Sequence, residues 1–319
     1  MGLEMSDKGE PIAEFLKDRI LKYFPDLKIE SSVLIDSGWD NHVLIINNEI
    51  VFRFPKNGVQ ISKFLTEIRL LQSLKDFPFK IPDYTYIITE GDVFGGYRLI
   101  SGNPLNSVKK LTNSLLKDFG ILFSYLWRIK PEKCSEIGLP IHSPVTWLKH
   151  QNGLITTFSN SLNRFIPVDF FRSLKDVSAD ILSEMNKNDF RLIHGDLYRE
   201  NVRITESGNN ISGIIDWSDA SFGDFALDIA AISMDFDLTE LLPVFERFEG
   251  LINVNTLRRI GLYQIIEPLY AADYFLDLGN IEEVSRRCRI ITDKWMNDLE
   301  FRNIYNINDV KDLWHTKQR

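Results

Sequence analysis

The sequence predicts an α+β fold with two lobes: an N-terminal lobe built on an antiparallel sheet, and a larger, mainly helical C-terminal lobe. Short apolar and β-branched runs, separated by turn residues, dominate the chain between residues 33 and 100. Beyond the breaker Ser101-Gly102-Asn103-Pro104, apolar residues recur mostly at helical spacing. A length of 319 residues also fits about two domains. We therefore expect the two lobes to comprise residues 1–101 and 102–319.

The N-terminal lobe is expected to begin with an amphipathic helix, because apolar residues recur at helical spacing between Pro11 and Pro25. The strands expected after it occupy residues 33–35, 42–46, 50–54, 84–89 and 93–100. Between the third and fourth strands, residues 61–74 carry apolar side chains on one helical face and charged ones, such as Lys63 and Glu67, on the other. This order predicts an antiparallel sheet with a helix inserted after its third strand.

The C-terminal lobe is expected to be helical apart from one β-hairpin. Its first helix is predicted over residues 115–129, where leucine and phenylalanine recur at helical spacing. The hairpin strands are predicted at residues 202–205 and 211–215, around the turn Gly208-Asn209-Asn210. Helical patterning resumes at Ala226 and continues to the end of the sequence.

Composition and charge narrow the possible functions. Lysine and arginine number 37 against 45 aspartate and glutamate residues, which leaves a formal net charge of -8. This charge disfavours binding to nucleic acid or to an anionic membrane and favours a cationic ligand. The two cysteines form no CxxC pair, no run is long enough to span a membrane, and the first twenty residues contain no signal-peptide core. We therefore expect a cytoplasmic protein, and no obligatory protein partner is evident.

The most informative stretch joins the end of a predicted strand to the predicted hairpin. His194-Gly195-Asp196 follows the apolar residues Leu192 and Ile193, and Asn201 follows Asp196 by five positions. Asp216 ends the second hairpin strand within the sequence Ile-Ile-Asp-Trp. Three oxygen-bearing side chains can therefore converge, and such ligands suit Mg²⁺ together with phosphates. Taken singly, these residues are also common as helix caps and turn formers.

This constellation resembles the catalytic loop and metal-binding segment of the aminoglycoside phosphotransferase family, whose members are small-molecule kinases with a protein-kinase-like fold. The resemblance implies that Asp196 orients the substrate hydroxyl and accepts its proton, while His194 braces the loop. It further implies that Asn201 and Asp216 hold Mg²⁺ bridging the phosphates of ATP or GTP.

The same resemblance implies nucleotide-binding residues in the N-terminal lobe. Ser37 lies in the loop that would cover the nucleotide, although this loop lacks the GxGxxG pattern. Arg53 occupies the place of the phosphate-pairing lysine, and Glu67, fourteen residues later, the place of its acidic partner. Leu99 and Ile100 belong to the segment that would bind the purine through backbone groups. A surface arginine on an edge strand and a solvated glutamate are the alternatives for Arg53 and Glu67.

Helices after the metal-binding segment would line the acceptor site in such a fold. Acidic residues there include Asp219, Asp228, Asp235 and Glu267, which we expect to contact a cationic substrate. Two other interpretations stay open: Asp228 could anchor its helix to the catalytic loop, and the others could form a solvated face.

The resulting hypothesis is a kinase that transfers the γ-phosphate of ATP or GTP to a hydroxyl of an aminoglycoside antibiotic. Kinases of macrolides, choline, a thioribose or a homoserine-like metabolite would share the same catalytic loop. A non-catalytic nucleotide-binding module is the alternative from another class, motivated by Arg53 and the reduced glycine loop. A protein kinase is disfavoured because no Ala-Pro-Glu marker follows the loop.

Overall fold

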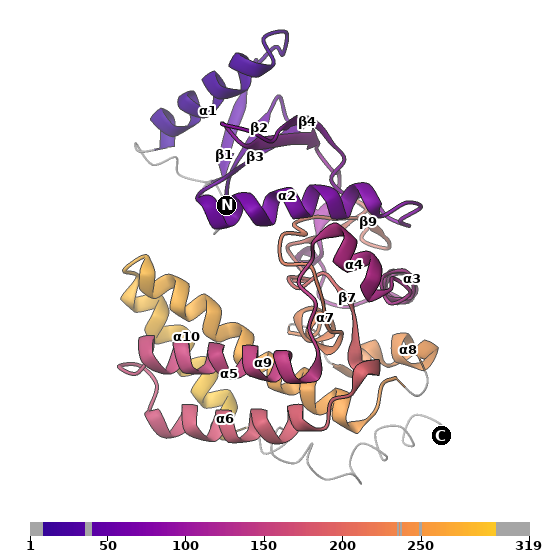
Figure 1. The fold of residues 1–319 in the computed structure, drawn as a ribbon, viewed down its shortest axis with the longest axis vertical. Helices are drawn as coiled ribbons and strands as arrows, with labels where there is room; N and C mark the ends of the chain where they lie inside the picture. The colour runs from indigo at the N-terminus through magenta and orange to yellow at the C-terminus, as the bar shows by residue number, and fades with distance from the viewer. Residues whose placement is uncertain (1–8, 36–39, 235, 237, 249–250, 298–319) are drawn as a thin grey trace. The chain divides into compact units, whose positions relative to one another are not determined.

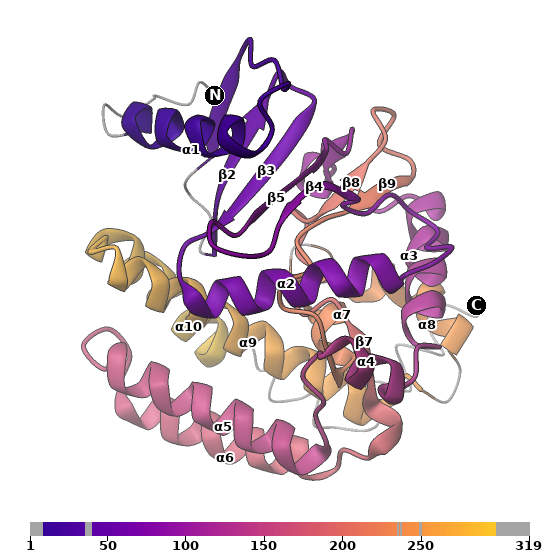
Figure 2. The same cartoon turned by 45° about the horizontal axis from the view of Figure 1, so that its top comes forward.

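The computed structural model describes residues 9–35, 40–234, 236, 238–248 and 251–297 (Figures 1 and 2). The chain forms two compact units. Unit 1 consists of the described residues up to Ser107 together with Ile137–Leu139 and Glu200–Asp219, and unit 2 consists of the rest. The hairpin that follows the loop of Asp196 thus belongs to unit 1. The functional division at residue 101 into a nucleotide-binding lobe and a catalytic lobe stays a prediction.

Unit 1 contains the five-stranded antiparallel sheet, whose strand order is β1-β2-β3-β5-β4. Its elements are α1 (Gly9–Tyr23), β1 (Ser32–Ile35), β2 (Asn41–Ile46), β3 (Ile50–Pro55), α2 (Gly58–Ser73), β4 (Tyr84–Ile88), β5 (Phe94–Arg98), β6 (Asn103–Pro104), β8 (Val202–Ile204) and β9 (Ile211–Ile214). The last three form a small separate sheet in the order β6-β8-β9. The predicted strands and the helix between the third and fourth strands are therefore present.

The side chains of β3 have different surroundings on its two faces, because successive side chains of a strand point to opposite sides of the sheet. Phe52 and Phe54 join a buried apolar cluster that includes Leu16 and Ile20 of α1. Arg53, which lies between the two phenylalanines, points to the other face and is itself buried. The helix α2, capped at its start by Asn57, contacts β3 and supplies a partner for this arginine.

Unit 2 is mainly helical, as expected. Its elements are α3 (Asn113–Leu126), α4 (Pro131–Ile137), α5 (Pro144–Ser161), α6 (Val168–Ser183), β7 (Phe190–Ile193), β10 (Ser221–Asp224), α7 (Ala226–Ile232), α8 (Leu242–Phe245), α9 (Val254–Asp277) and α10 (Ile281–Asn297). Helices α5 and α6 run side by side, and α9 packs against α7 and α10 (Figure 2). The predicted α+β class is confirmed.

A short two-stranded sheet lies inside the helical unit. β7 pairs antiparallel with β10, so that Ile193 lies opposite Ser221 and Phe190 opposite Asp224. The loop that carries Asp196 therefore leaves this sheet at the end of β7, and α7 begins directly after β10. Within the described ranges, no helix is long and apolar enough to cross a membrane.

Candidate active site

The loop that carries Asp196 is held by a buried carboxylate on α7. The backbone N–H of His194 donates to Oδ2 of Asp228 (2.8 Å), and that of Gly195 donates to Oδ1 (2.9 Å). Both carboxylate oxygens are thus used, and the Asp228 residue is 0% exposed. Because α7 is buried along its length, the position of the loop is fixed to a rigid element of unit 2.

The conformation of the loop explains why glycine precedes the aspartate. Gly195 has φ +83°, a left-handed conformation that costs an ordinary residue about 1–2 kcal/mol. One residue further, the N–H of Asp196 donates to Nδ1 of His194 at 3.3 Å. Because Nδ1 accepts this bond, the imidazole is the neutral tautomer that carries its proton on Nε2. The histidine is fully buried and contacts the backbone of Asp196 through this bond; its role in the proposed catalytic loop stays a prediction.

Asp228 has a strongly perturbed acidity. Burial raises the pKa of its carboxyl to about 7, although the two N–H donors of the loop oppose this shift. The sequence left two roles open for this residue. Its burial and its two backbone contacts agree with the first of these roles, anchoring of the loop that carries Asp196.

In unit 1, Arg53 joins two acidic side chains that come from different segments. Nη1 donates to Oε1 of Glu67 (2.6 Å), and Nη2 donates to Oδ1 of Asp216 (2.6 Å). Tyr84 accepts a longer bond from Nη1 at 3.3 Å. Burial by itself would lower the pKa of Arg53, but the carboxylates of Asp216 and Glu67 raise it above its ordinary value. The guanidinium is therefore a permanent buried cation.

Glu67 is sealed between Arg53 and the segment after Asp216. Burial raises the pKa of Glu67 to about 7, while Arg53 lowers it. The backbone N–H of Trp217 donates to Oε1 of Glu67 at 3.4 Å, and the indole N–H of Trp217 donates to the carbonyl of Ile214. Trp217, which is 1% exposed, thus fixes the turn that presents Asp216. The sequence pattern contained this tryptophan, but its packing role was not predicted.

Asp216 and Asn201 lie at the same end of the β8–β9 hairpin. Val202 pairs with Ile214, and the N–H of Ile215 donates to the carbonyl of Asn201 (3.0 Å). Asp216 has φ +64°, a conformation that non-glycine residues rarely adopt and that costs about 1–3 kcal/mol. Such strain persists only where surrounding contacts maintain it, and it is common at functional sites.

The donor set of this hairpin end fits a hard divalent cation. Among the described residues, no group of three or more His, Cys, Asp and Glu side chains could hold a metal ion. Mg²⁺ does not need such a cage, since it commonly uses one or two carboxylates and completes its shell with water and phosphate oxygens. The half-exposed Asp216 carboxylate and the neighbouring Asn201 amide offer that kind of incomplete oxygen set.

The segment expected to bind the purine has one donor already in use. The N–H of Leu99 donates to the carbonyl of Glu49 (2.7 Å), so a purine contact at Leu99 would use its carbonyl oxygen. Ile100 is buried, and its side chain lies close to Gly213 of β9. Ser37, expected in the covering loop, lies outside the described residues.

The expected acceptor-binding residues have different surroundings. Asp219, in unit 1, forms an ion pair with Lys63 (2.7 Å). Glu267, on α9 of unit 2, accepts a hydrogen bond from the hydroxyl of Tyr198 (3.1 Å), two residues after Asp196. Burial raises the pKa of Tyr198 well above its usual range, so this hydroxyl stays a donor. Asp235 lies outside the described residues.

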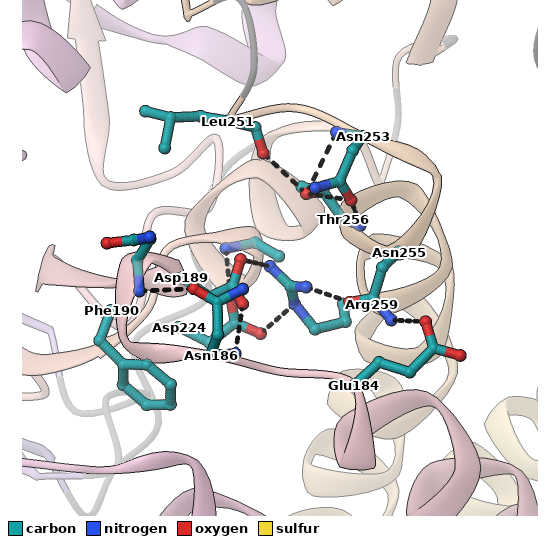
Figure 3. Close-up of polar contacts among 12 residues, drawn as sticks. Glu184, Asn186, Asp189, Phe190, Asp224, Leu251, Asn253, Asn255, Thr256 and Arg259 are labelled. Carbon is teal, nitrogen blue, oxygen red and sulfur yellow. Dashed lines mark hydrogen bonds and ion pairs between the residues drawn. The ribbon is translucent and has the colours of Figure 1, made fainter.

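A buried network that the sequence analysis missed supports the sheet from which the catalytic loop leaves (Figure 3). Arg259 of α9 donates from Nε to Asp224 (2.8 Å) and from Nη2 to Asp189 (2.9 Å), and it also contacts Asn255. The hydroxyl of Tyr263 donates to the same oxygen of Asp224 (2.6 Å). The sequence held one signal for this network, since residues 255, 259 and 263 are four apart and share a helix face.

Comparison with known proteins gives one family match and many structural matches. The phosphotransferase enzyme family, APH, matches residues 32–260. No curated protein matches the chain significantly.

Three solved structures show the range of similar proteins. The GDP and kanamycin complex of APH(2'')-IIIa has a TM-score of 0.75 and 20% identity, and the match covers 89% of this chain and 99% of that one. A macrolide 2'-phosphotransferase type I has a TM-score of 0.66 and 19% identity, with coverage of 91% and 99%. ADP-bound aminoglycoside phosphotransferase APH(2'')-Ib has a TM-score of 0.63 and 18% identity, with coverage of 86% and 96%.

These likenesses show a shared fold, and they confirm the resemblance inferred from the catalytic loop. The family match includes the strand of Arg53, the helix of Glu67, the catalytic loop and the segment of Asp216. Because it extends over well more than half of the sequence, the chain belongs to the phosphotransferase enzyme family.

Proposed function

We propose that this phosphotransferase is a small-molecule kinase that transfers the γ-phosphate of ATP or GTP to a hydroxyl group of an aminoglycoside antibiotic. The observation that carries the proposal is that the buried Arg53 contacts both the buried Glu67 and the half-exposed Asp216. A surface arginine or a solvated glutamate, the alternatives from the sequence, would not be buried together in this way. A buried cation beside an oxygen ligand set suits phosphate groups and their counter-ion.

The catalytic loop supports the same reaction from unit 2. Asp196 would accept the proton of the acceptor hydroxyl as its oxygen bonds to the γ-phosphorus. The bond from this phosphorus to the bridging oxygen breaks, and the nucleoside diphosphate leaves. The hydrogen bonds of His194 and Gly195 hold the backbone of Asp196 in place, which suits a reaction that depends mainly on positioning.

Asn201 and Asp216 would hold Mg²⁺, and Arg53, anchored by Glu67, would contact the phosphates. When bound, Mg²⁺ neutralises negative charge on the phosphates. The choice between ATP and GTP stays open, because similar chains were solved with GDP and with ADP.

An aminoglycoside is the proposed acceptor because its amino groups are cationic. The chain carries a net charge of -8. Glu267 offers a half-buried carboxylate, which a hydrogen bond from Tyr198 links to the loop that carries Asp196. A carboxylate that is already oriented by a hydrogen bond binds an ammonium group at lower entropic cost. One similar chain was solved with kanamycin, which agrees with this class of substrate.

A macrolide is the second candidate acceptor. The macrolide 2'-phosphotransferase matches over 91% of this chain, nearly the same coverage and identity as its aminoglycoside counterparts. The shared catalytic loop does not discriminate between these acceptors.

The proposal is tested by Mg²⁺-dependent release of ADP and GDP across aminoglycosides, macrolides and simple amino-alcohols. Asp196→Asn should lower kcat by about 10²–10⁴-fold, as expected when a general base is lost, and should leave nucleotide affinity nearly unchanged. Glu206→Gln makes the same charge change at an exposed position of the β8–β9 turn and serves as the control. Turnover with another acceptor alone would overturn the aminoglycoside assignment, and nucleotide binding without any turnover would favour the non-catalytic module.

A further inference from the structure

Arg53 uses its two terminal nitrogens on two different carboxylates. Nη1 donates to Glu67 and Nη2 to Asp216, each at 2.6 Å. A planar guanidinium presents these two donors side by side in a rigid fork, whereas a lysine ammonium is a single point charge on a shorter reach. The replacement of the expected lysine by arginine therefore allows one side chain to satisfy both acids at once.

The two ends of this fork are not equivalent. The side chain of Glu67 is 0% exposed and that of Arg53 is 5% exposed, but that of Asp216 is 41% exposed. The bond to Glu67 is therefore sealed inside unit 1, between β3 and α2. The bond to Asp216 lies at the surface of the unit, where an incoming cation can compete for the carboxylate.

The hairpin end also shows that Asp216 is held under constraint. Its φ of +64° is unfavourable for aspartate, and Ser218 donates a second hydrogen bond to the same Oδ1 at 3.2 Å. Arg53 and Ser218 thus donate to the same Oδ1 of Asp216, and of these two donors Arg53 is the charged one. In this structure, Arg53 thus neutralises the carboxylate proposed to hold the metal.

We propose that Arg53 is a displaceable latch that couples metal binding to nucleotide binding, an inference that rests on the function proposed above. In the free protein, Nη2 occupies Asp216 while Nη1 stays on Glu67. On binding of a metal–nucleotide complex, Nη2 leaves Asp216 and takes a phosphate oxygen as its new acceptor. The arginine is a positioning residue for the metal ligand and does not itself bind the metal.

The latch has a thermodynamic consequence. A divalent metal that binds alone must break the Arg53–Asp216 ion pair, and Nη2 then loses this carboxylate without gaining a phosphate. With nucleotide present, the phosphate supplies that replacement. Metal and nucleotide therefore strengthen each other's binding, and the coupling is reciprocal.

The test measures binding of Mn²⁺ alone, as a paramagnetic substitute for Mg²⁺, by electron paramagnetic resonance on the full chain without nucleotide. The variant Arg53→Met with Glu67→Gln removes the latch, keeps the net charge of the wild type and leaves no unpaired buried glutamate. It should bind Mn²⁺ about tenfold more tightly than the wild type, a factor within the usual range of coupling between two sites. Circular dichroism establishes that the double variant is folded.

Two further variants separate the latch from general electrostatics. Arg69→Met removes a positive charge from the same helix as Glu67, but Arg69 contacts Ile137 and Thr66 and not Asp216. It should leave Mn²⁺ affinity within about twofold of the wild type, because exposed charges are screened. Arg53→Lys should give an intermediate Mn²⁺ affinity, since an ammonium retains charge but loses the fork.

Measurement of ADP and GDP affinity with and without Mn²⁺ distinguishes failure of the latch from failure of the proposed kinase function. The wild type should show a Mn²⁺-dependent gain in nucleotide affinity that falls about tenfold in the double variant. An unchanged gain, or Mn²⁺ affinity equal to that of the wild type, would overturn the latch and leave the proposed function intact. A wild type that binds neither nucleotide, with or without Mn²⁺, would overturn both.

Discussion

Replacement of Arg259 by methionine should destabilise unit 2 far more than the same change at the neighbouring Arg258. Arg259 is 1% exposed and lies between two buried carboxylates, Asp224 (0% exposed) and Asp189 (5% exposed). The methionine variant would leave both carboxylates buried without their shared cation (Figure 3). Removal of one partner from a buried ion pair costs about 3–5 kcal/mol, a large part of the stability of a typical domain.

Arg258 provides a matched control on the same helix. It pairs with Asp180 (2.6 Å) and Glu184 (3.1 Å), whose side chains are 65% and 53% exposed. These acids stay solvated when their partner is lost, so Arg258→Met should cost about 0–1 kcal/mol. The two variants make the same chemical change one residue apart, and the main difference between the sites is burial: the partner acids of Arg259 are buried, whereas those of Arg258 are exposed.

Urea unfolding followed by tryptophan fluorescence measures both costs. Trp147 is a local reporter because its indole N–H donates to the hydroxyl of Tyr263 (2.7 Å), which in turn contacts Asp224. The double variant Asp224→Asn with Arg259→Met should lose less stability than the sum of the single changes, since it removes one of the two stranded charges. Equal losses for Arg258→Met and Arg259→Met, or additive losses in the double variant, would refute this account of the network.

Three further predictions concern the catalytic loop and the acceptor site. Gly195→Ala should lower kcat, because φ +83° strains alanine by about 1–2 kcal/mol and thereby shifts the loop that carries Asp196. The affinity for nucleotide should stay unchanged, and steady-state kinetics together with equilibrium nucleotide binding checks both outcomes. The raised pKa of Asp228, about 7 against an ordinary 3.8, stabilises the fold at low pH, and this contribution is lost as the pH rises through about 7. The unfolding free energy of the wild type relative to Asp228→Asn should therefore fall by roughly 2–3 kcal/mol between about pH 5 and pH 8, and a constant difference would contradict the shift. Glu267→Gln should raise the KM of a cationic acceptor about 10–100-fold with little change in the nucleotide KM, as expected for loss of a charge-assisted hydrogen bond; an unchanged acceptor KM would place the acceptor elsewhere.

Much of the fold could be predicted because it depends on local patterns. The strands of the first sheet follow from β-branched runs between turn residues, and the positions of α2 and the β8–β9 hairpin follow from periodicity. The strand order could not be inferred in full, because β5 pairs with β3 and leaves β4 at the edge. That choice depends on packing across the sheet, which periodicity along one segment does not encode.

The candidate site was predictable in its residues and less so in their contacts. The resemblance placed Arg53, Glu67 and Asp216 in one functional group, and the structure joins them by hydrogen bonds. It did not reveal that Arg53 reaches both acids, because the sequence does not state which rotamer a buried arginine adopts. The burial of Asp228 was also undetermined, since an acidic residue at a helix start occurs equally well on a solvated surface.

Arg53 and Arg259 are both buried in ion pairs, but the burial of their partner acids differs. This difference decides whether an ion pair is permanent or can be exchanged for contacts with a ligand. Arg259 is enclosed with both of its carboxylates, so no solvent species can replace either contact without opening the core. Arg53 has one enclosed partner and one, Asp216, that is 41% exposed. A divalent cation or an anion from solution can reach only the second kind of pair, and the energetic cost of separating it falls when each charge gains a new partner. The same reasoning applied to Arg259 predicts that neither metal nor nucleotide alters its contacts, so hydrogen exchange in α9 around residue 259 should not change when the proposed metal and nucleotide are added.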